Sequence, residues 1–277
     1  MNVLKNSGLF LLFIILFSTL VNAQSKRFYY EVNFKLDSAG KYPRKDFAVL
    51  EINKDYNIFM SNEYIVTDSL NQINKDKQEF AYPKFKEIVE YQKSDNSFNF
   101  IYNLSMNYYQ FNAKKKISWN ISDEKKKIGN FSVTKATADF GGRKWTAWFC
   151  AEIPFPYGPY VFYGLPGLIL EISDDNENYH FSFIQNKNYK TELNSQNIIK
   201  NLFDDRKINI KEKDWKTIQL NYYNNPIPEY KSGKAYMEKE DGSKYTVNDY
   251  RDLEKNLQKQ IKILNNPIEV SEKVIYK

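Results

Sequence analysis

The chain has 277 residues, with 40 basic and 34 acidic side chains, and its net charge of +6 is too small to predict a nucleic-acid partner. A single cysteine excludes an intramolecular disulfide, and a single histidine excludes a histidine-rich zinc site. Tyr, Phe and Trp make up 17% of the residues, which is enough aromatic surface to fill a sizeable β core.

Residues 1–23 have the layout of a secretory signal peptide. A short polar start with one cation, Lys5, precedes an apolar run over residues 9–20, and the small side chain of Ala23 fits a cleavage site. The apolar run is shorter than the roughly 20 residues that a membrane-spanning helix needs. We therefore predict cleavage after Ala23 and a periplasmic or secreted protein without a transmembrane segment after processing. Residues 24–277 are expected to form a single β-rich domain.

Short alternating segments separated by polar turns dominate the rest of the chain and predict a large, twisted antiparallel sheet. The expected strands cover residues 28–36, 47–52, 56–60, 86–91, 98–104, 108–111, 116–120, 131–138, 145–150, 168–173 and 179–184. Residues 61–83 are polar and predict a loop or a short helical excursion. In the C-terminal third, apolar spacing predicts helices over 212–223 and 249–265, the second preceded by a capping box of Thr246 and Asp249.

The most distinctive segment runs from Ile153 to Ile172 and contains the sequence Gly-Leu-Pro-Gly-Leu-Ile at residues 164–169. Over residues 135–183 the chain resembles the GLPGLI family of exported Bacteroidetes proteins, and a late Asn-Pro-Ile at residues 266–268 also fits. The resemblance implies a lineage and an exported location, but no mechanism, because the family has no established function. The layout is also similar to the open, half-barrel sheets of envelope lipoprotein carriers, which is an analogy of fold alone.

Within this segment, Pro and Gly occupy the second and third places of a β-turn over residues 165–168, which is the signature of a type II turn. A structural role is therefore the first interpretation for Gly164, Leu165, Pro166, Gly167, Leu168 and Ile169. The alternative is a binding edge, in which the aromatic side chains before the turn are exposed. Its candidate residues are Tyr157, Tyr160, Phe162 and Tyr163.

No catalytic constellation, metal site or cofactor motif emerges from the remaining residues. The only imidazole, His180, lies in an expected strand without a catalytic motif, and Cys150 is expected to be a buried apolar filler. The acidic turn at residues 174–177 lacks calcium-loop spacing and predicts a solvated turn. The lysine runs at 114–116 and 125–127 are expected to be solvated strand ends, with an anionic-surface edge as the alternative.

Two serines, Ser38 and Ser69, stand in Asp-Ser-aliphatic triplets that resemble the acceptor of Bacteroidetes O-glycosylation. Both are expected in loops, where an acceptor must be reachable.

Three functions fit these observations. The leading hypothesis is a non-catalytic envelope protein that binds an apolar ligand or a polypeptide partner. The alternatives are a hydrolase that depends on carboxylates, and an accessory subunit of an outer-membrane uptake system. A closed, fully packed sheet would oppose the first, a cleft with carboxylates of raised pKa would favour the second, and a large exposed apolar patch would favour the third.

Overall fold

The computed structural model describes residues 25–105, 107–203 and 207–277, so the predicted signal peptide and its cleavage site lie outside the described residues. The strands are β1 (Ser25–Lys35), β2 (Pro43–Ile52), β3 (Tyr56–Ser61), β4 (Ile88–Gln92), β5 (Ser97–Leu104), β6 (Asn107–Ala113), β7 (Asn120–Ile128), β8 (Phe131–Phe140), β9 (Arg143–Cys150), β10 (Leu168–Asp174), β11 (Tyr179–Tyr189) and β12 (Lys207–Asn209). The helices are α2 (Asn62–Ile73), α3 (Ser195–Phe203), α4 (Trp215–Asn224), α5 (Pro228–Lys231) and α6 (Val247–Ile263), with short 3₁₀ turns η1 (Glu212–Asp214) and η2 (Val270–Glu272).

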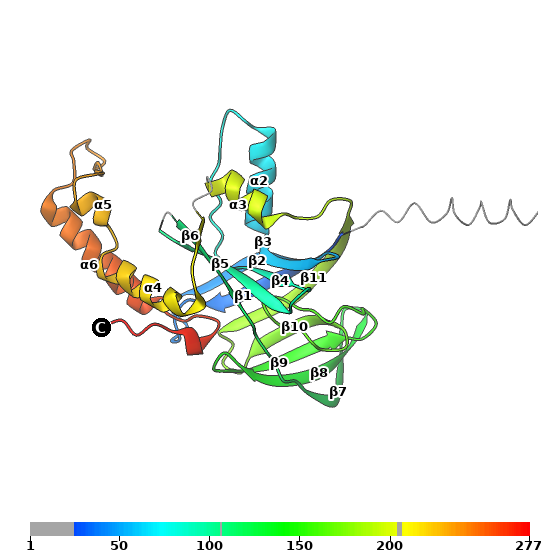
Figure 1. Cartoon of the computed structure of the whole chain (residues 1–277). Helices are drawn as coiled ribbons and strands as arrows, with labels where there is room; N and C mark the ends of the chain where they lie inside the picture. Colours follow the sequence, from blue (N-terminus) through cyan, green and yellow to red (C-terminus); the bar gives the residue numbers. More distant parts are fainter. Residues whose placement is uncertain (1–24, 106, 204–206) are drawn as a thin grey trace, which may run out of the picture.

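The described strands form one open sheet of 12 strands in the order β12-β6-β5-β4-β3-β2-β1-β11-β10-β9-β8-β7. Neighbouring strands are antiparallel except for β12, which runs parallel to β6 at one edge. Figure 1 shows that the sheet bends, so that β7–β10 lie in one half and β2–β6 in the other. The predicted mainly β fold, with an open sheet and helices in the C-terminal third, is confirmed.

One expected strand is largely absent, the loop or short helical excursion expected over residues 61–83 contains a helix, and one further helix is present. Residues 116–119 are not a strand, because the edge strand β7 begins only at Asn120 and carries the second lysine run in its interior. Residues 62–73 form the helix α2, which Ser61 caps by accepting a hydrogen bond from the Glu63 N–H. The helix α3 was not predicted, although its apolar residues Ile198, Ile199 and Leu202 are buried.

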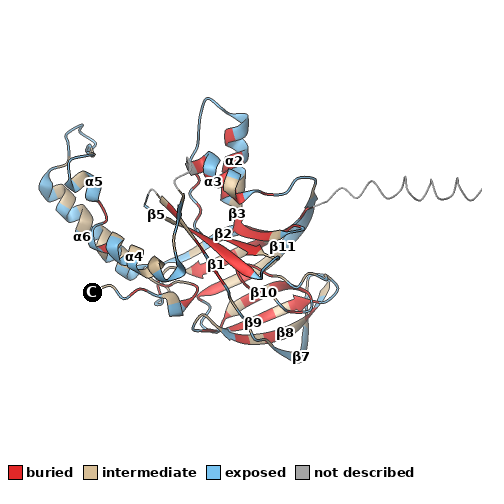
Figure 2. Ribbon diagram, in the orientation of Figure 1, coloured by how far each residue is buried: buried red, intermediate tan, exposed pale blue. Residues whose placement is uncertain are grey.

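The core has two parts, which Figure 2 shows as buried bands on the sheet. The smaller part lies between β2–β5 and the helices α2 and α3. The larger part lies on the concave side of the bent sheet, between residues of β1–β5 and residues of β8–β11. The segment between β9 and β10, residues 151–167, enters this concave side and contributes Tyr160, Val161, Phe162 and Leu165 to the core.

The helices α4, α5 and α6 form an arm that projects from the sheet (Figure 1). The predicted capping box begins α6, with Thr246 and Asp249 each accepting from the other's backbone N–H. Neither α4 nor α6 ends in a left-handed C-cap, since φ is −149° at Asn225 and −86° at Leu264. Among the described residues, none of the helices combines the length and apolar character that crossing a membrane requires.

Candidate functional site

The turn that precedes β10 is not the predicted type II turn. The Gly167 N–H donates to the Leu165 carbonyl at 2.8 Å, and the Leu168 N–H donates to the Ile153 carbonyl, so Pro166 is the centre of a three-residue turn. Glycine is required at 167 for a different reason. A Cβ there would lie 2.2 Å from the backbone oxygen of Cys150, so the two chain segments approach too closely for any side chain.

Of the four aromatic residues proposed for a binding edge, two are buried in the interior and two are half-buried. Tyr160 and Phe162 are 4% and 1% exposed, and Tyr157 and Tyr163 are half-buried. Phe162 packs against Trp145 of β9 with ring centroids 4.6 Å apart, while Tyr163 packs against Phe98 of β5 at 5.5 Å. The loop therefore bridges the two halves of the bent sheet, and Tyr160 and Phe162 do not have the exposure that the binding-edge alternative requires.

A buried arginine brings the late Asn-Pro-Ile segment to the same end of the sheet. The Arg143 guanidinium donates to the carbonyls of Ile268 and Pro267, to the Asn266 side chain at 2.8 Å and to Asp174 at 3.0 Å. Four hydrogen bonds therefore come from one guanidinium, and three of them hold the segment of residues 266–268. It follows that the two parts of the chain that carried the family resemblance meet in space.

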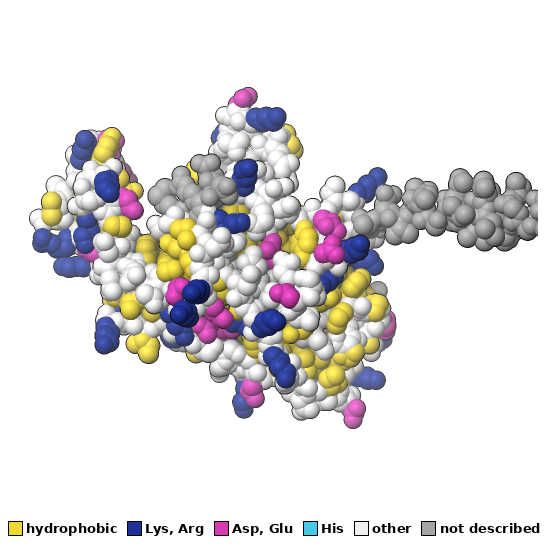
Figure 3. Space-filling view, viewed as in Figure 1, with side chains coloured by type: hydrophobic (Ala, Val, Ile, Leu, Met, Phe, Trp, Pro, Cys, Tyr) yellow, Lys and Arg dark blue, Asp and Glu magenta, His cyan; other side chains and the backbone are white. Residues whose placement is uncertain are grey.

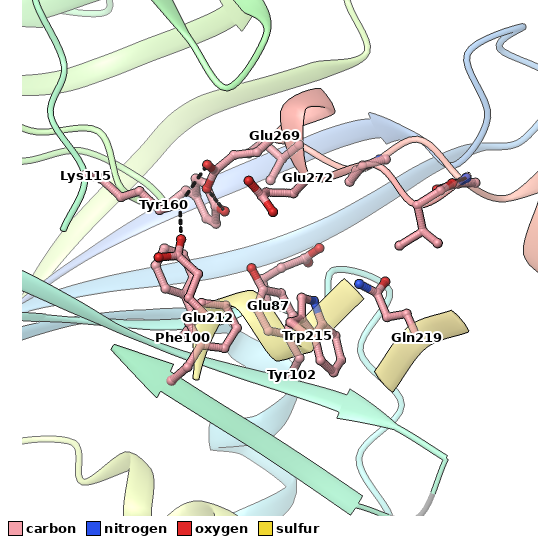
Figure 4. Close-up of a pocket in the computed structure, with 15 residues that line it drawn as sticks. Glu87, Phe100, Tyr102, Lys115, Tyr160, Glu212, Trp215, Gln219, Glu269 and Glu272 are labelled. Atoms are coloured by element: carbon pink, nitrogen blue, oxygen red, sulfur yellow. Dashed lines mark hydrogen bonds and ion pairs between the residues drawn. The ribbon is translucent and has the colours of Figure 1, made fainter. Parts of the chain in front are cut away.

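A cavity of about 150 Å³ lies where residues 265–274 pass the segment between β9 and β10, residues 151–167 (Figure 4). We call residues 151–167 the motif loop. Aromatic rings of β5, β6 and α4 form one wall, and the stretch from Asn265 to Val274 forms another. Its polar lining is dominated by carboxylates: Glu87, Glu212, Glu269 and Glu272, with Lys115, Gln219 and the Tyr102 and Tyr160 side chains. In Figure 4 the Glu87 and Glu272 carboxylates point into the same central space.

One side of the cavity is a fixed hydrogen-bonded network. The Tyr160 hydroxyl donates to Glu269 at 2.8 Å, and the Lys115 ammonium lies 3.0 Å from Glu269 and 3.1 Å from Glu212. Burial would lower the pKa of Lys115, but its two carboxylate partners outweigh burial and raise it. Burial, reinforced by the neighbouring Tyr102 and Glu269, raises the pKa of Tyr160 well above its ordinary value. Lys115 therefore stays charged and Tyr160 stays neutral over the physiological pH range.

The opposite side of the cavity contains the Glu87 side chain, whose environment differs from that of Glu269. Glu87 is partly buried and has no ion-pair partner among the described residues. Burial raises the pKa of the Glu87 carboxyl. Hydrogen bonds from backbone N–H groups lower it, but they offset only part of the effect of burial. A carboxylate with a raised pKa that faces a cavity is a recognised mark of a functional residue. On the wall below it, the Trp215 indole stacks on Tyr102 with ring centroids 5.0 Å apart.

We expect Glu87→Gln to raise the melting temperature at pH 7. The folded pKa of Glu87 lies above its unfolded value of about 4.3, so the group contributes most to stability below that pH. Its contribution is lost as pH rises through the folded pKa. Glutamine cannot ionise, so the Glu87→Gln variant does not lose this stability as pH rises. Its higher melting temperature relative to the wild type should therefore disappear in melts recorded at acidic pH. Glu212→Gln is the matched control, because it removes a partner of Lys115 and is expected to give no gain.

The other residues singled out from the sequence lie away from the cavity or have structural roles. Cys150 is buried as expected, and the half-buried His180 contacts only Ser182 among the bonds described. Asp174 is buried against Arg143, so the expectation of a solvated acidic turn was wrong at that position. No group of three or more potential metal ligands with suitable geometry occurs in the described ranges.

The two glycosylation candidates are both exposed, but only Ser38 lies in a turn. Ser69 lies within α2, where its hydroxyl donates to the Ile65 carbonyl, so the expected loop position was wrong. The first lysine run also differs from its expected role as a solvated strand end, because Lys115 is in the cavity and 12% of its side chain is exposed.

Comparison with known proteins gives a family match and a fold match. A family model described as "Protein of unknown function (Porph_ging)" matches residues 140–171. No curated protein matches the chain. Two structures of PNGF-II, in the P21 and C2 space groups, are 15% and 16% identical to it over 71% of this chain, with TM-scores of 0.50 and 0.49. The chain spans about a third of the length of these structures, and at this identity the likeness concerns the fold alone.

The matched residues 140–171 include Arg143, Tyr160 and the motif loop, but none of the cavity carboxylates. Sequence reasoning missed those carboxylates because they come from three separate places in the chain, which no sequence pattern connects. One signal was available. The late Asn-Pro-Ile continues directly into Glu269, whose carboxylate accepts a hydrogen bond from Tyr160 between β9 and β10.

Proposed function

We propose that the protein is an exported, non-catalytic member of the GLPGLI-type proteins that binds a polypeptide partner through the cavity between the motif loop and residues 265–274. The observation that supports this most is the preorganised acidic lining. Glu269 is fixed by Tyr160 and Lys115, Glu272 lies 3.4 Å from Lys216, and Glu87 and Glu272 both point into the cavity. A site whose polar groups are held before the ligand arrives loses less entropy on binding.

The ligand that fits this lining is a cation, such as the arginine or lysine side chain of a partner. Among the described residues that line the cavity, four are carboxylates and one, Lys115, is a cation; Lys216, which is not in the lining, lies 3.4 Å from Glu272. Trp215 and Tyr102 add aromatic surface, which attracts a guanidinium or ammonium group. An apolar ligand is disfavoured, because the motif loop already occupies the concave side of the sheet with its own aromatic rings.

The expected location is the periplasm or the exterior of the cell. It rests on the predicted signal peptide of residues 1–23 and on the resemblance of the motif region. Native mass spectrometry of protein isolated from its own host would identify a co-purifying partner.

We expect acetyl-arginine amide to bind with a dissociation constant on the order of 1 mM, as suits a ligand of this size, and the neutral acetyl-glutamine amide not to bind. NMR titration of the protein measures both. Loss of one charged hydrogen bond lowers affinity by about tenfold, so Glu272→Gln should weaken binding by that factor. Glu171→Gln is the control, because Glu171 pairs with Lys126 outside the cavity. Equal binding of the two amides, or equal weakening by the control, would contradict the proposal.

A second function has one specific observation in its favour. The raised pKa of Glu87 is what a general acid in a carboxylate-dependent hydrolase requires. Hydrolysis of a glycan or peptide substrate that Glu87→Gln abolishes, while its folding is unchanged, would replace the binding proposal. The accessory subunit of an uptake system has no comparable support.

A further inference from the structure

The solvent face of α6 has an arrangement of charge that the cavity does not use. Arg251, Lys255, Lys259 and Lys262 are spaced four, four and three residues apart, so they lie in one row along the helix. All four are exposed. In the described part of the chain no carboxylate lies within ion-pair distance of any of them, although Asp252 lies at the border of the row. Figure 3 shows Lys and Arg side chains gathered on this arm.

The opposite face of the helix is already occupied. Leu253, Leu257 and Ile261 are half-buried, because α6 packs against α4 and α5. The apolar stripe of α6 is therefore already covered, and the charged face does not need a partner to bury it. It presents a row of cations on an arm that projects from the sheet.

Exposed apolar side chains stand at both ends of the same row. Val247, in the first turn of α6, is 75% exposed and Ile263, in the last turn, is 40% exposed. A polysaccharide or nucleic acid would neutralise the cations but leave these side chains in water. A lipid surface accepts both, because anionic headgroups attract the cations and the acyl boundary takes up the apolar groups.

We propose that this face of α6 docks the protein onto an anionic lipid surface. Each Lys or Arg close to such a surface raises the partition coefficient by about fivefold. The row of four therefore gives an increase of about 600-fold. The attraction is electrostatic, so it weakens as salt is raised. It does not depend on the cavity, and cavity variants should leave it unchanged.

Co-sedimentation with phosphatidylcholine vesicles, with and without phosphatidylglycerol, tests this. We expect the mature protein to bind only the anionic vesicles, and the variant with Arg251, Lys255, Lys259 and Lys262 all changed to Gln to lose that binding. The matched control changes four exposed lysines elsewhere, Lys41, Lys54, Lys125 and Lys127, to Gln and should bind like the wild type. No binding by the wild type, an equal loss in the control, or binding to heparin but not to vesicles would overturn the proposal.

Discussion

Gly167→Ala is expected to destabilise the protein by about 1–3 kcal/mol, and Gly167→Val by more, because neither side chain has room. The Cβ would lie 2.2 Å from the Cys150 oxygen and 2.6 Å from its carbonyl carbon. Both atoms are backbone, so no rotamer change relieves the contact. Movement of the turn is opposed by Leu168, Leu170 and Ile172, which are fully buried directly after it. For a chain of this size each kcal/mol lowers the melting temperature by about 2–4 °C.

Gly164→Ala is the control within the same motif. Gly164 has a φ of +93°, so alanine there is strained, but nothing lies within 4 Å of its Cβ position. We therefore expect a smaller loss, on the order of 1 kcal/mol. Thermal melts then compare the loss of stability caused by a close contact, in Gly167→Ala, with the loss caused by backbone strain, in Gly164→Ala. Equal melting temperatures would show that the approach to Cys150 does not determine the need for glycine.

The strands of the sheet could be predicted because alternation of apolar and polar residues is a local property. Residues 47–52 and 56–60 were expected as strands, and their counterparts β2 and β3 pair directly. The Gly141-Gly142 turn likewise joins β8 and β9. The extent of the core was harder to predict, because the burial of Tyr160 and Phe162 depends on the bend of the sheet. That bend brings β5 and β9 to opposite sides of the loop.

The cavity could not be predicted in the same way. Glu87 precedes β4, Lys115 follows β6, Glu212 precedes α4 and Glu269 lies near the C-terminus. No local pattern relates residues so far apart in the chain. The sequence of a lysine run outside regular structure also does not show whether its side chains are solvated or form ion pairs. Lys115 differs from its neighbours only because Glu212 and Glu269 happen to face it.

Arg143→Met is expected to destabilise the protein by about 3–5 kcal/mol. Methionine fills a similar volume but removes the hydrogen bonds to Asp174, Asn266, Pro267 and Ile268. Asp174 is 2% exposed, so its carboxylate would stay buried without a cation, and this unpaired charge accounts for most of the loss. Lys126→Met, which breaks the half-exposed pair with Glu171, should change stability by no more than about 1 kcal/mol.

The same substitution separates anchoring of the cavity wall from general stability. Asn266 is also held by the Tyr179 hydroxyl, which donates to its carbonyl at 2.7 Å, so the segment should loosen without leaving the sheet entirely. Hydrogen exchange in Arg143→Met should therefore accelerate first at the amides of residues 268–274, well below the melting temperature. The affinity for acetyl-arginine amide should fall as well, because Glu269 and Glu272 belong to that segment. Uniform acceleration across β8–β10, with the segment no faster than the strands, would show that Arg143 stabilises the sheet and does not position the cavity.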